Sequence, residues 1–244
     1  MRVRFIGCGD AFGSGGRFNT CFQVVSPSAS FLIDCGASSM VALRKWGVDP
    51  NSIDTVFITH LHGDHFGGLP FLILDAQLGS RRAAPLTIAG PPGLRERLDD
   101  AMEVFFPGST RIERRFAVEI VELTPDKPAR VGAVDVLPMG VVHSCGAPPL
   151  ALRLTVDGRS VAYTGDTEWT EALIPVANDV DLFIVEAYFH DRKVRFHLDL
   201  ATVAANMDRL RPKRTILTHL GPDMLGRDLA GRFEVADDGL VVDL

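Results

Sequence analysis

The chain has 244 residues, of which 46% are hydrophobic and 23% charged, and its formal net charge is −6 with a pI near 5.6. This composition is close to the average of soluble globular proteins and excludes a disordered, fibrous or low-complexity chain. No apolar run reaches the ~20 residues that a membrane-spanning helix needs, and the acidic balance disfavours a dedicated nucleic-acid binder.

The first residues have a pattern typical of a strand rather than of a secretory signal. Arg2 and Arg4 alternate with apolar residues over positions 2–6, and glycines follow at once. A secretory signal would instead place a long apolar stretch after its basic start. We therefore expect a cytoplasmic protein.

The four cysteines, Cys8, Cys21, Cys35 and Cys145, lie far apart and form no Cys-x-x-Cys pair. In a cytosolic chain of this size such cysteines are typical of buried thiols rather than of disulfides or a zinc knuckle. We predict four free, buried thiols.

Short runs of β-branched and other apolar residues, each closed by a polar or glycine-rich turn, predict strands along the chain. The runs are Phe22–Val25, Phe31–Asp34, Asp54–Thr59, Pro85–Ala89, Val134–Leu137, Val161–Thr164, Leu182–Glu186 and Thr215–Thr218. Apolar residues at helical spacing predict helices over Ser38–Trp46, Gly93–Phe106 and Ala201–Leu210. Strands that first cluster and then alternate with helices indicate an α/β fold, with sheets packed face to face and helices outside. No linker or repeat divides the chain, so we expect one domain over residues 1–244.

Three of the seven histidines lie within six consecutive residues, directly after the apolar run 56–58. This segment contains His60, His62, Asp64 and His65, and Gly63 allows the backbone to turn sharply between them. Imidazole nitrogens and carboxylate oxygens are ligands for zinc and similar first-row metals. The spacing therefore predicts a metal site, with His60 and His62 on one ion and Asp64 and His65 turned toward a second.

Three further candidate ligands each follow a run predicted to be a strand: His143, Asp166 and His219. The carboxyl ends of strands converge on one edge of a sheet layer, where sites in α/β proteins usually form. We therefore expect these side chains to complete a dinuclear site with the histidine-rich segment.

These residues resemble the metallo-β-lactamase superfamily in motif, order and spacing. The resemblance rests on His-x-His-x-Asp-His at 60–65, His143, Thr-Gly-Asp-Thr at 164–167 and Thr-His at 218–219. It begins at the Val-x-Phe-Ile-Gly-Cys-Gly segment of residues 3–9 and covers most of the chain. The resemblance implies a four-layer αβ/βα sandwich with the metal site along one edge of the sheets.

The same resemblance implies a role for each ligand. His60, His62 and His143 would hold one metal, and Asp64, His65 and His219 the other, with Asp166 bridging the two. Asp34 resembles the carboxylate that orients a ligand histidine in this family, although capping a turn is an equally good interpretation of that residue.

Glu186-Ala187, followed by Arg-Phe-His-Leu-Asp at 195–199, resembles the paired Glu and His of the tRNA 3′-processing endonucleases (RNase Z) and their small phosphodiesterase relatives. An imidazole hydrogen-bonded to a carboxylate can protonate an alkoxide leaving group. We therefore predict that His197 is catalytic and is aligned by Glu186. The alternative for His197 is a plain helix-entry residue, because Asp199 can cap the following helix in either case.

Only 22 residues separate His143 from Asp166. The bacterial tRNA endonucleases that the motifs resemble insert a long arm at this place, and this chain has no room for one. His-Leu-Asp at 197–199 also departs from their usual sequence after the histidine. Together with the net charge of −6, these features indicate a compact relative with a small substrate.

These observations predict a dinuclear metal-dependent hydrolase, specifically a phosphodiesterase that cleaves a small or cyclic phosphodiester with a hydroxide bridging two divalent ions. Asp64 would orient this nucleophile, and His197 would protonate the leaving group. Zinc is the expected metal, and manganese or iron suits the same ligands. The expected partner is a small phosphoester rather than nucleic acid or a membrane. Proteins of the branch that the motifs resemble often form homodimers, although no local feature of this sequence indicates one.

Three other functions fit the same residues: a lactonase or thioesterase, an RNase Z-like RNA endonuclease, and a non-catalytic metal-binding domain. The natural substrate, the metal and the oligomeric state stay open at this point. Candidate substrate-pocket residues are Pro148, Pro149, Trp169, Tyr188 and Phe189. The remaining histidine, His190, is expected in a surface loop.

Overall fold

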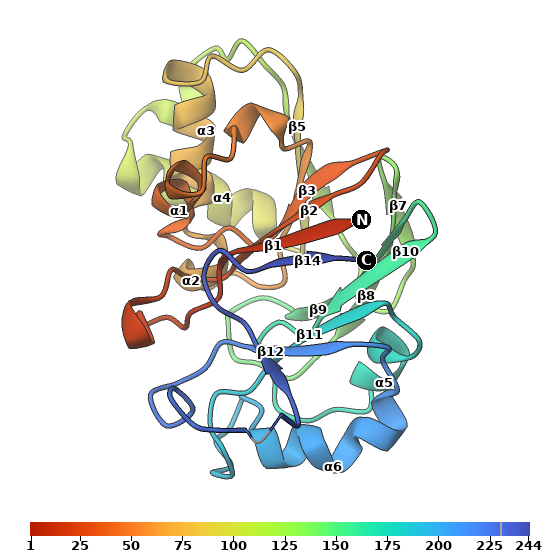
Figure 1. Ribbon diagram of the computed structural model, residues 1–244. Helices are drawn as coiled ribbons and strands as arrows, with labels where there is room; N and C mark the ends of the chain where they lie inside the picture. The colour runs from red at the N-terminus through yellow and green to blue at the C-terminus, as the bar shows by residue number, and fades with distance from the viewer. Residues whose placement is uncertain (230) are drawn as a thin grey trace.

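The computed structural model describes residues 1–229 and 231–244. Two sheets form the centre of this part of the chain, and helices cover the outer face of each (Figure 1). In chain order, the strands of the first sheet are β1 (Arg2–Gly7), β2 (Cys21–Val25), β3 (Ser30–Ile33), β4 (Thr55–Phe57), β5 (Leu86–Gly90), β6 (Val118–Glu122) and β14 (Val241–Asp243). The strands of the second sheet are β7 (Ala129–Val131), β8 (Val134–Gly140), β9 (Leu150–Val156), β10 (Arg159–Tyr163), β11 (Leu182–Glu186), β12 (Thr215–Thr218) and β13 (Glu234–Val235).

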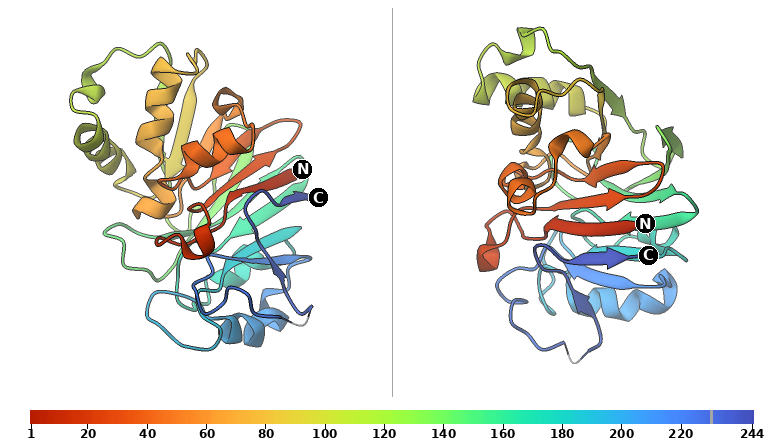
Figure 2. Two further views of the ribbon diagram at one scale, coloured as in Figure 1. Left: turned by 60° about the vertical axis from the view of Figure 1, so that its left-hand side comes forward. Right: turned by 45° about the horizontal axis from the view of Figure 1, so that its top comes forward.

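The first sheet has the strand order β14-β1-β2-β3-β4-β5-β6, and the second has β13-β12-β11-β10-β9-β8-β7. Strands β3 to β6 run parallel, as do β10 to β13. The strand β14 adds to the edge of β1, so the two ends of the chain lie side by side in both views of Figure 2. Parallel strands bring their carboxyl ends to one edge, which is the edge where the site forms.

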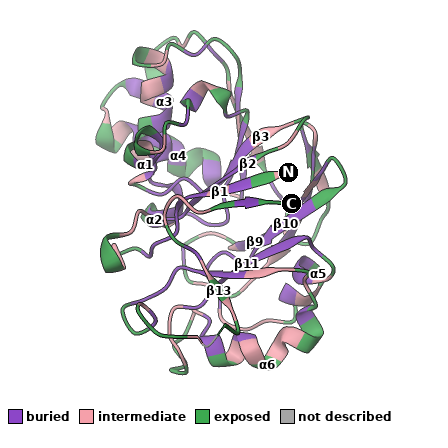
Figure 3. Ribbon diagram, viewed as in Figure 1, coloured by how far each residue is buried: buried purple, intermediate pink, exposed green. Residues whose placement is uncertain are grey.

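Three buried apolar clusters define four layers. The largest cluster lies between the sheets, the second lies under the helices of the first sheet, and the third lies under those of the second sheet. The covering helices are α1 (Ser39–Lys45), α3 (Leu69–Leu78) and α4 (Leu94–Phe105) on one side, and α5 (Leu173–Ala177) and α6 (Leu200–Leu210) on the other. This arrangement confirms the predicted αβ/βα sandwich, and Figure 3 shows the buried strands at its centre.

Aromatic side chains join the two sheets face to face. The Phe22 ring on β2 makes edge contacts with the Phe5 ring of β1 at 5.0 Å and with the Tyr163 ring of β10 at 5.1 Å between centroids. All three side chains are fully buried. Side chains of both sheets therefore meet in the core between them, which agrees with the expected face-to-face packing.

All eight runs predicted as strands and all three predicted helices are present, with ends that shift by a few residues. The four cysteines are free and buried, which confirms that prediction. Of the helices in the described part of the chain, none combines the length and the apolar character that a membrane crossing requires.

The edge of the second sheet opposite the site contains a buried carboxylate, Asp181, directly before β11. Its oxygens accept hydrogen bonds from the Ser160 backbone N–H at 2.9 Å, from Arg159 Nη1 at 3.1 Å and from Lys213 Nζ at 3.2 Å. Burial opposes the charged form, but the bonds from Ser160, Lys213 and Arg159 outweigh it and hold the pKa of Asp181 below its ordinary value. One carboxylate thus ties the starts of three strands together.

We expect Asp181→Asn to lower the free energy of unfolding by about 1–3 kcal/mol at pH 7 because it removes charge-assisted hydrogen bonds. The pKa of Asp181 is lower in the folded than in the unfolded chain. Its stabilising effect is therefore complete above the unfolded pKa of about 4, and it is lost as the pH falls through the folded pKa. Urea unfolding of both proteins at pH 7 and at pH 3 measures this effect. An equal difference at both pH values would contradict the prediction.

Candidate metal centre

The histidine-rich segment lies where β4 ends and the short helix α2 (Gly63–Phe66) begins. His60 and His65 are fully buried, and Asp64 is 8% exposed. The loop after β3 packs directly against this turn, because a Cβ atom on Gly36 would lie 2.1 Å from the backbone oxygen of Asp64. Glycine at this position therefore lets two loops of the first sheet meet at the site.

The first group of side chains consists of His60, His62 and His143, and each can direct one ring nitrogen to a common point, with those nitrogens within 4.8 Å of one another. The Nε2 atom of His143 lies 3.1 Å from Nδ1 of His62. His143 follows β8 of the second sheet, so this group spans the two halves of the sandwich.

The second group consists of Asp64, His65, Asp166 and His219, all of them buried. The Nε2 atom of His65 lies 3.3 Å from Asp64 Oδ2 and 3.3 Å from Asp166 Oδ1. The Nε2 atom of His219 lies 3.3 Å from Asp64 Oδ2 and 3.5 Å from Asp166 Oδ2. Asp166 also lies 3.9 Å from His60 Nε2, so its carboxylate reaches both groups.

Among the described residues, several buried polar atoms of these groups have no hydrogen-bond partner. They include His60 Nε2, His65 Nε2 and Asp166 Oδ1. A buried polar atom left unpaired costs about 1–3 kcal/mol, and cations held by the two groups would satisfy all three. Nitrogen and oxygen donors in this combination suit zinc, manganese or iron. The two groups therefore fit divalent metal ions.

The protonation of the first group suits metal binding, because a histidine ligand must be neutral. Burial, reinforced by the neighbouring His65, holds the pKa of His60 well below its ordinary value. Burial likewise lowers the pKa of His143. Both imidazoles are therefore neutral at physiological pH and have a lone pair for an ion.

The carboxylates of the second group raise the pKa of its two histidines. Burial opposes a charge on His219, but Asp166 and Asp64 outweigh it and raise its pKa to about 9. Asp166, Asp64 and Asp34 also raise the pKa of His65 against the effect of burial. The cluster attracts positive charge, which a proton supplies in the metal-free chain and which a metal ion would displace.

Asp34 lies directly behind this group and is fully buried. Its Oδ2 atom lies 2.7 Å from His65 Nδ1 and also accepts a hydrogen bond from Thr59 Oγ1 at 2.8 Å. Its Oδ1 atom accepts from the Thr59 backbone N–H at 2.8 Å. These contacts favour the interpretation of Asp34 as the carboxylate that orients His65 over that of a simple turn cap.

We expect Asp34→Asn to weaken metal binding about 10–100-fold. The amide N–H of asparagine would face Nδ1 of His65 and favour the tautomer with a proton on Nε2, the nitrogen that faces the metal group. Competition with a chromogenic zinc chelator measures the affinity. Asp243→Asn, at an exposed ion pair with Arg2 on the sheet edge, is the matched control. Equal affinities for Asp34→Asn and the control would exclude this role.

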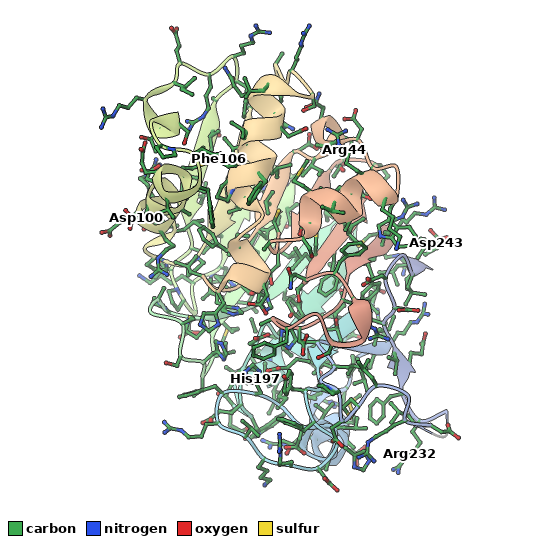
Figure 4. The ribbon with its side chains drawn as sticks, turned by 90° about the vertical axis from the view of Figure 1, so that its left-hand side faces the viewer. Arg44, Asp100, Phe106, His197, Arg232 and Asp243 are labelled. Carbon is green, nitrogen blue, oxygen red and sulfur yellow. The ribbon has the colours of Figure 1, made fainter. Side chains whose placement is uncertain are left out.

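Glu186 and His197 form a hydrogen-bonded pair beside the second group. The Nδ1 atom of His197 lies 3.0 Å from Glu186 Oε2 and 3.9 Å from Asp166 Oδ2. Glu186 ends β11 and is fully buried, and its Oε1 atom accepts from the backbone N–H of Leu198 at 3.3 Å. Burial disfavours the charged imidazole, but the bond to Glu186 outweighs it and raises the pKa of His197. Figure 4 shows His197 between the orange N-terminal helices and the blue C-terminal segments.

A cavity of about 270 Å³ opens over the site. His62, Asp64, His143, Asp166, His197 and His219 line it together with Ala11, Phe12 and Tyr188. Tyr188 was predicted as a pocket residue, whereas Phe12, which is 83% exposed, was not. The sequence feature that could have indicated Phe12 as a pocket residue is its position directly before a glycine-rich loop.

The other predicted pocket residues lie elsewhere. Trp169 lines a larger neighbouring hollow of about 670 Å³, which His197 shares, and Phe189 lines a third one. Pro148 and Pro149 line neither the site cavity nor these two hollows. His190 lies in a loop with 39% of its side chain exposed, as expected, and outside both metal-binding groups.

Comparisons with known proteins agree on one superfamily. A family model described as anti-Pycsar protein Apyc1 matches residues 1–236. Ribonuclease Z of Geobacillus kaustophilus is 30% identical over 277 aligned positions, which cover 90% of this chain and 88% of that protein. The crystal structure of human tRNase Z, short form, has a TM-score of 0.81 at 25% identity and covers 100% of this chain and 99% of that one. The metallo-β-lactamase fold protein YhfI of Bacillus subtilis has a TM-score of 0.78 at 22% identity, with 99% and 98% covered.

Proposed function

Because the chain belongs to the anti-Pycsar protein Apyc1 family, within the RNase Z and phosphodiesterase branch of the metallo-β-lactamase superfamily, and is thus a metal-dependent hydrolase, we propose that it is a phosphodiesterase for a small or cyclic phosphodiester. The observation that carries this proposal is the Glu186–His197 pair beside the two groups of metal-binding side chains. Cleavage of a phosphodiester releases an alkoxide that needs a proton, and a positioned imidazole can supply one.

In this proposal the site holds two divalent ions, with zinc as the expected metal. His60, His62 and His143 would hold one ion, and Asp64, His65 and His219 the other. Asp166 would contact both, since its carboxylate reaches His60, His65 and His219. When bound, two such metal ions lower the pKa of water and neutralise charge on phosphoryl oxygens.

The side chains of this chain would do the rest of the chemistry. Asp64 would orient the attacking water from the open side of the second group. Glu186 fixes the His197 ring through Nδ1, which leaves Nε2 to donate its proton to the departing oxygen. Because Glu186 is buried and also bonded to the Leu198 backbone, the ring has one preferred orientation.

Three features support a small substrate. The cavity of about 270 Å³ is a small volume for a ligand site. Between His143 and Asp166 the chain forms only a short loop and the hairpin of β9 and β10, with no arm that could hold a large RNA. The net charge of −6 also disfavours a polyanionic partner. The predicted homodimer remains part of this proposal.

Side-by-side assays test the function. The zinc-loaded protein would be offered bis-p-nitrophenyl phosphate, a cyclic phosphodiester, a thioester, a lactone and a tRNA precursor, with its metal content measured in parallel. We expect hydrolysis of the first two. Activity on the thioester or lactone alone would contradict the proposal. Cleavage of the tRNA precursor alone would favour an RNA endonuclease, and metal-replete protein that is inactive on every substrate would favour a non-catalytic domain.

A further inference from the structure

The peptide directly before His197 has an unusual backbone conformation. Phe196 has φ +71°, in the left-handed region that bulky side chains rarely occupy. A non-glycine residue in such a region costs of order 1–3 kcal/mol and persists only where its surroundings hold it. The neighbouring loop, residues 191–195, is exposed, and its Val194 carbonyl accepts a hydrogen bond from the His197 backbone N–H at 3.4 Å, which closes a turn around Phe196.

Two further hydrogen bonds tie the Phe196 backbone in this turn to the segments that contain Glu168 and His143. The Phe196 backbone N–H donates to Glu168 Oε2 at 3.1 Å, and its carbonyl oxygen accepts from His143 Nδ1 at 2.9 Å. Glu168 is itself anchored, since its backbone N–H donates to the Val142 carbonyl at 3.1 Å. Glu168 therefore connects the segment that carries His143 with the segment that carries His197.

The contact with Phe196 determines the tautomer of His143. A carbonyl oxygen can only accept, so Nδ1 of His143 must carry the proton and Nε2 keeps its lone pair. That Nε2 atom lies 3.1 Å from His62, within the first metal-binding group. Histidine ligands of metals almost always donate their other N–H to such an acceptor, which fixes the ring and its tautomer.

We propose that Glu168 is a positioning residue: it holds the Phe196 peptide in its left-handed conformation, so that the Phe196 carbonyl fixes the Nδ1–H tautomer of His143. Because His197 is the next residue, the same hydrogen bond also fixes the backbone position from which the His197 side chain extends toward Glu186. The inference rests on the proposed function only in the roles of His143 and His197. Its test includes measurements of zinc affinity and of the His143 tautomer, neither of which requires catalytic activity.

Glu168→Ala removes the acceptor, and Glu168→Gln keeps an acceptor oxygen but removes the charge. We expect Glu168→Ala to lower zinc affinity about 10–100-fold in chelator competition, and Glu168→Gln to restore it to within about threefold of the parent. In long-range ¹H–¹⁵N spectra of the metal-free protein, His143 should change from one tautomer to a mixture only in Glu168→Ala. Glu171→Ala, at an exposed ion pair with Arg209, is the matched control.

A double variant tests the backbone argument. Glycine adopts positive φ without strain, so Phe196→Gly combined with Glu168→Ala should regain at least about threefold of the lost affinity. Unchanged affinity and an unchanged His143 tautomer in folded Glu168→Ala would overturn the proposal. If Glu168→Ala does not fold, Glu168→Asp takes its place, and parental affinity and tautomer in that variant would overturn it equally. Absence of phosphodiesterase activity in the parent would count against the proposed function alone.

Discussion

Replacing Asp166 with alanine is expected to lower kcat/KM for bis-p-nitrophenyl phosphate by at least about 1,000-fold. Its carboxylate lies 3.3 Å from His65, 3.5 Å from His219 and 3.9 Å from His60, so it reaches both candidate metal-binding groups. Without it, each group loses the carboxylate that we propose as a shared ligand. We therefore expect loss of at least one ion per chain together with the loss of activity.

Three measurements separate this effect from unfolding. Metal content per chain after gel filtration should fall, circular dichroism should stay unchanged, and excess zinc should restore little activity. His65→Ala is expected to behave in the same way, because His65 contacts Asp34, Asp64 and Asp166. Asp208→Ala, at an exposed position of α6, is the control. A metal-replete Asp166→Ala protein within tenfold of the parent would show that Asp166 does not join the two groups.

The sequence predicted much of the site because its side chains follow short apolar strands. Asp166 follows β10, Glu186 ends β11, and His219 follows β12, and these three strands pair in parallel register. Parallel neighbours place such positions at one edge whatever the rest of the fold does. The contact between Glu186 and His197 could be proposed only through a family resemblance, because the two residues are 11 positions apart and a loop connects them.

Other parts of the fold have no comparable local signal. The helix α3 (Leu69–Leu78) is apolar on several faces, with Leu72 buried and Phe71 and Leu78 exposed, so helical periodicity does not identify it. The strand β14 is three residues long and exists because it pairs with β1 at the other end of the chain. Both elements depend on tertiary packing rather than on local pattern.

The hydrogen bond between Glu168 and the Phe196 backbone also has no local signal in the sequence. Phenylalanine is a poor residue for positive φ, so nothing in the sequence around Phe196 indicates its conformation. Glu168 stands two residues after Asp166, and its role depends on where the exposed loop 191–195 returns to the sheet. A contact between residues 28 positions apart is determined by the fold and becomes visible only in the structure.

Replacing His197 with alanine is expected to lower kcat by about 100–10,000-fold for a phosphodiester with an alkyl leaving group. The imidazole donates through Nδ1 to Glu186 Oε2, which favours the cationic ring and leaves a proton on Nε2 for the departing oxygen. An alkoxide is a strong base and needs that proton, whereas p-nitrophenolate leaves without it. The loss of kcat should therefore be much smaller for a p-nitrophenyl ester than for an alkyl ester.

Metal content distinguishes a proton donor from a ligand. His197 lies 3.9 Å from Asp166 and can be grouped with Asp166, Glu186 and His219 as a third set of donors. If His197 is a proton donor, His197→Ala should keep the metal content of the parent. If His197 is a metal ligand, the variant should lose metal. His190→Ala, in the loop outside both groups, is the control and should leave kcat unchanged. Loss of metal, or an equal loss of kcat for both leaving groups, would show that His197 does not act as the acid, because a proton donor affects only the reaction that needs the proton.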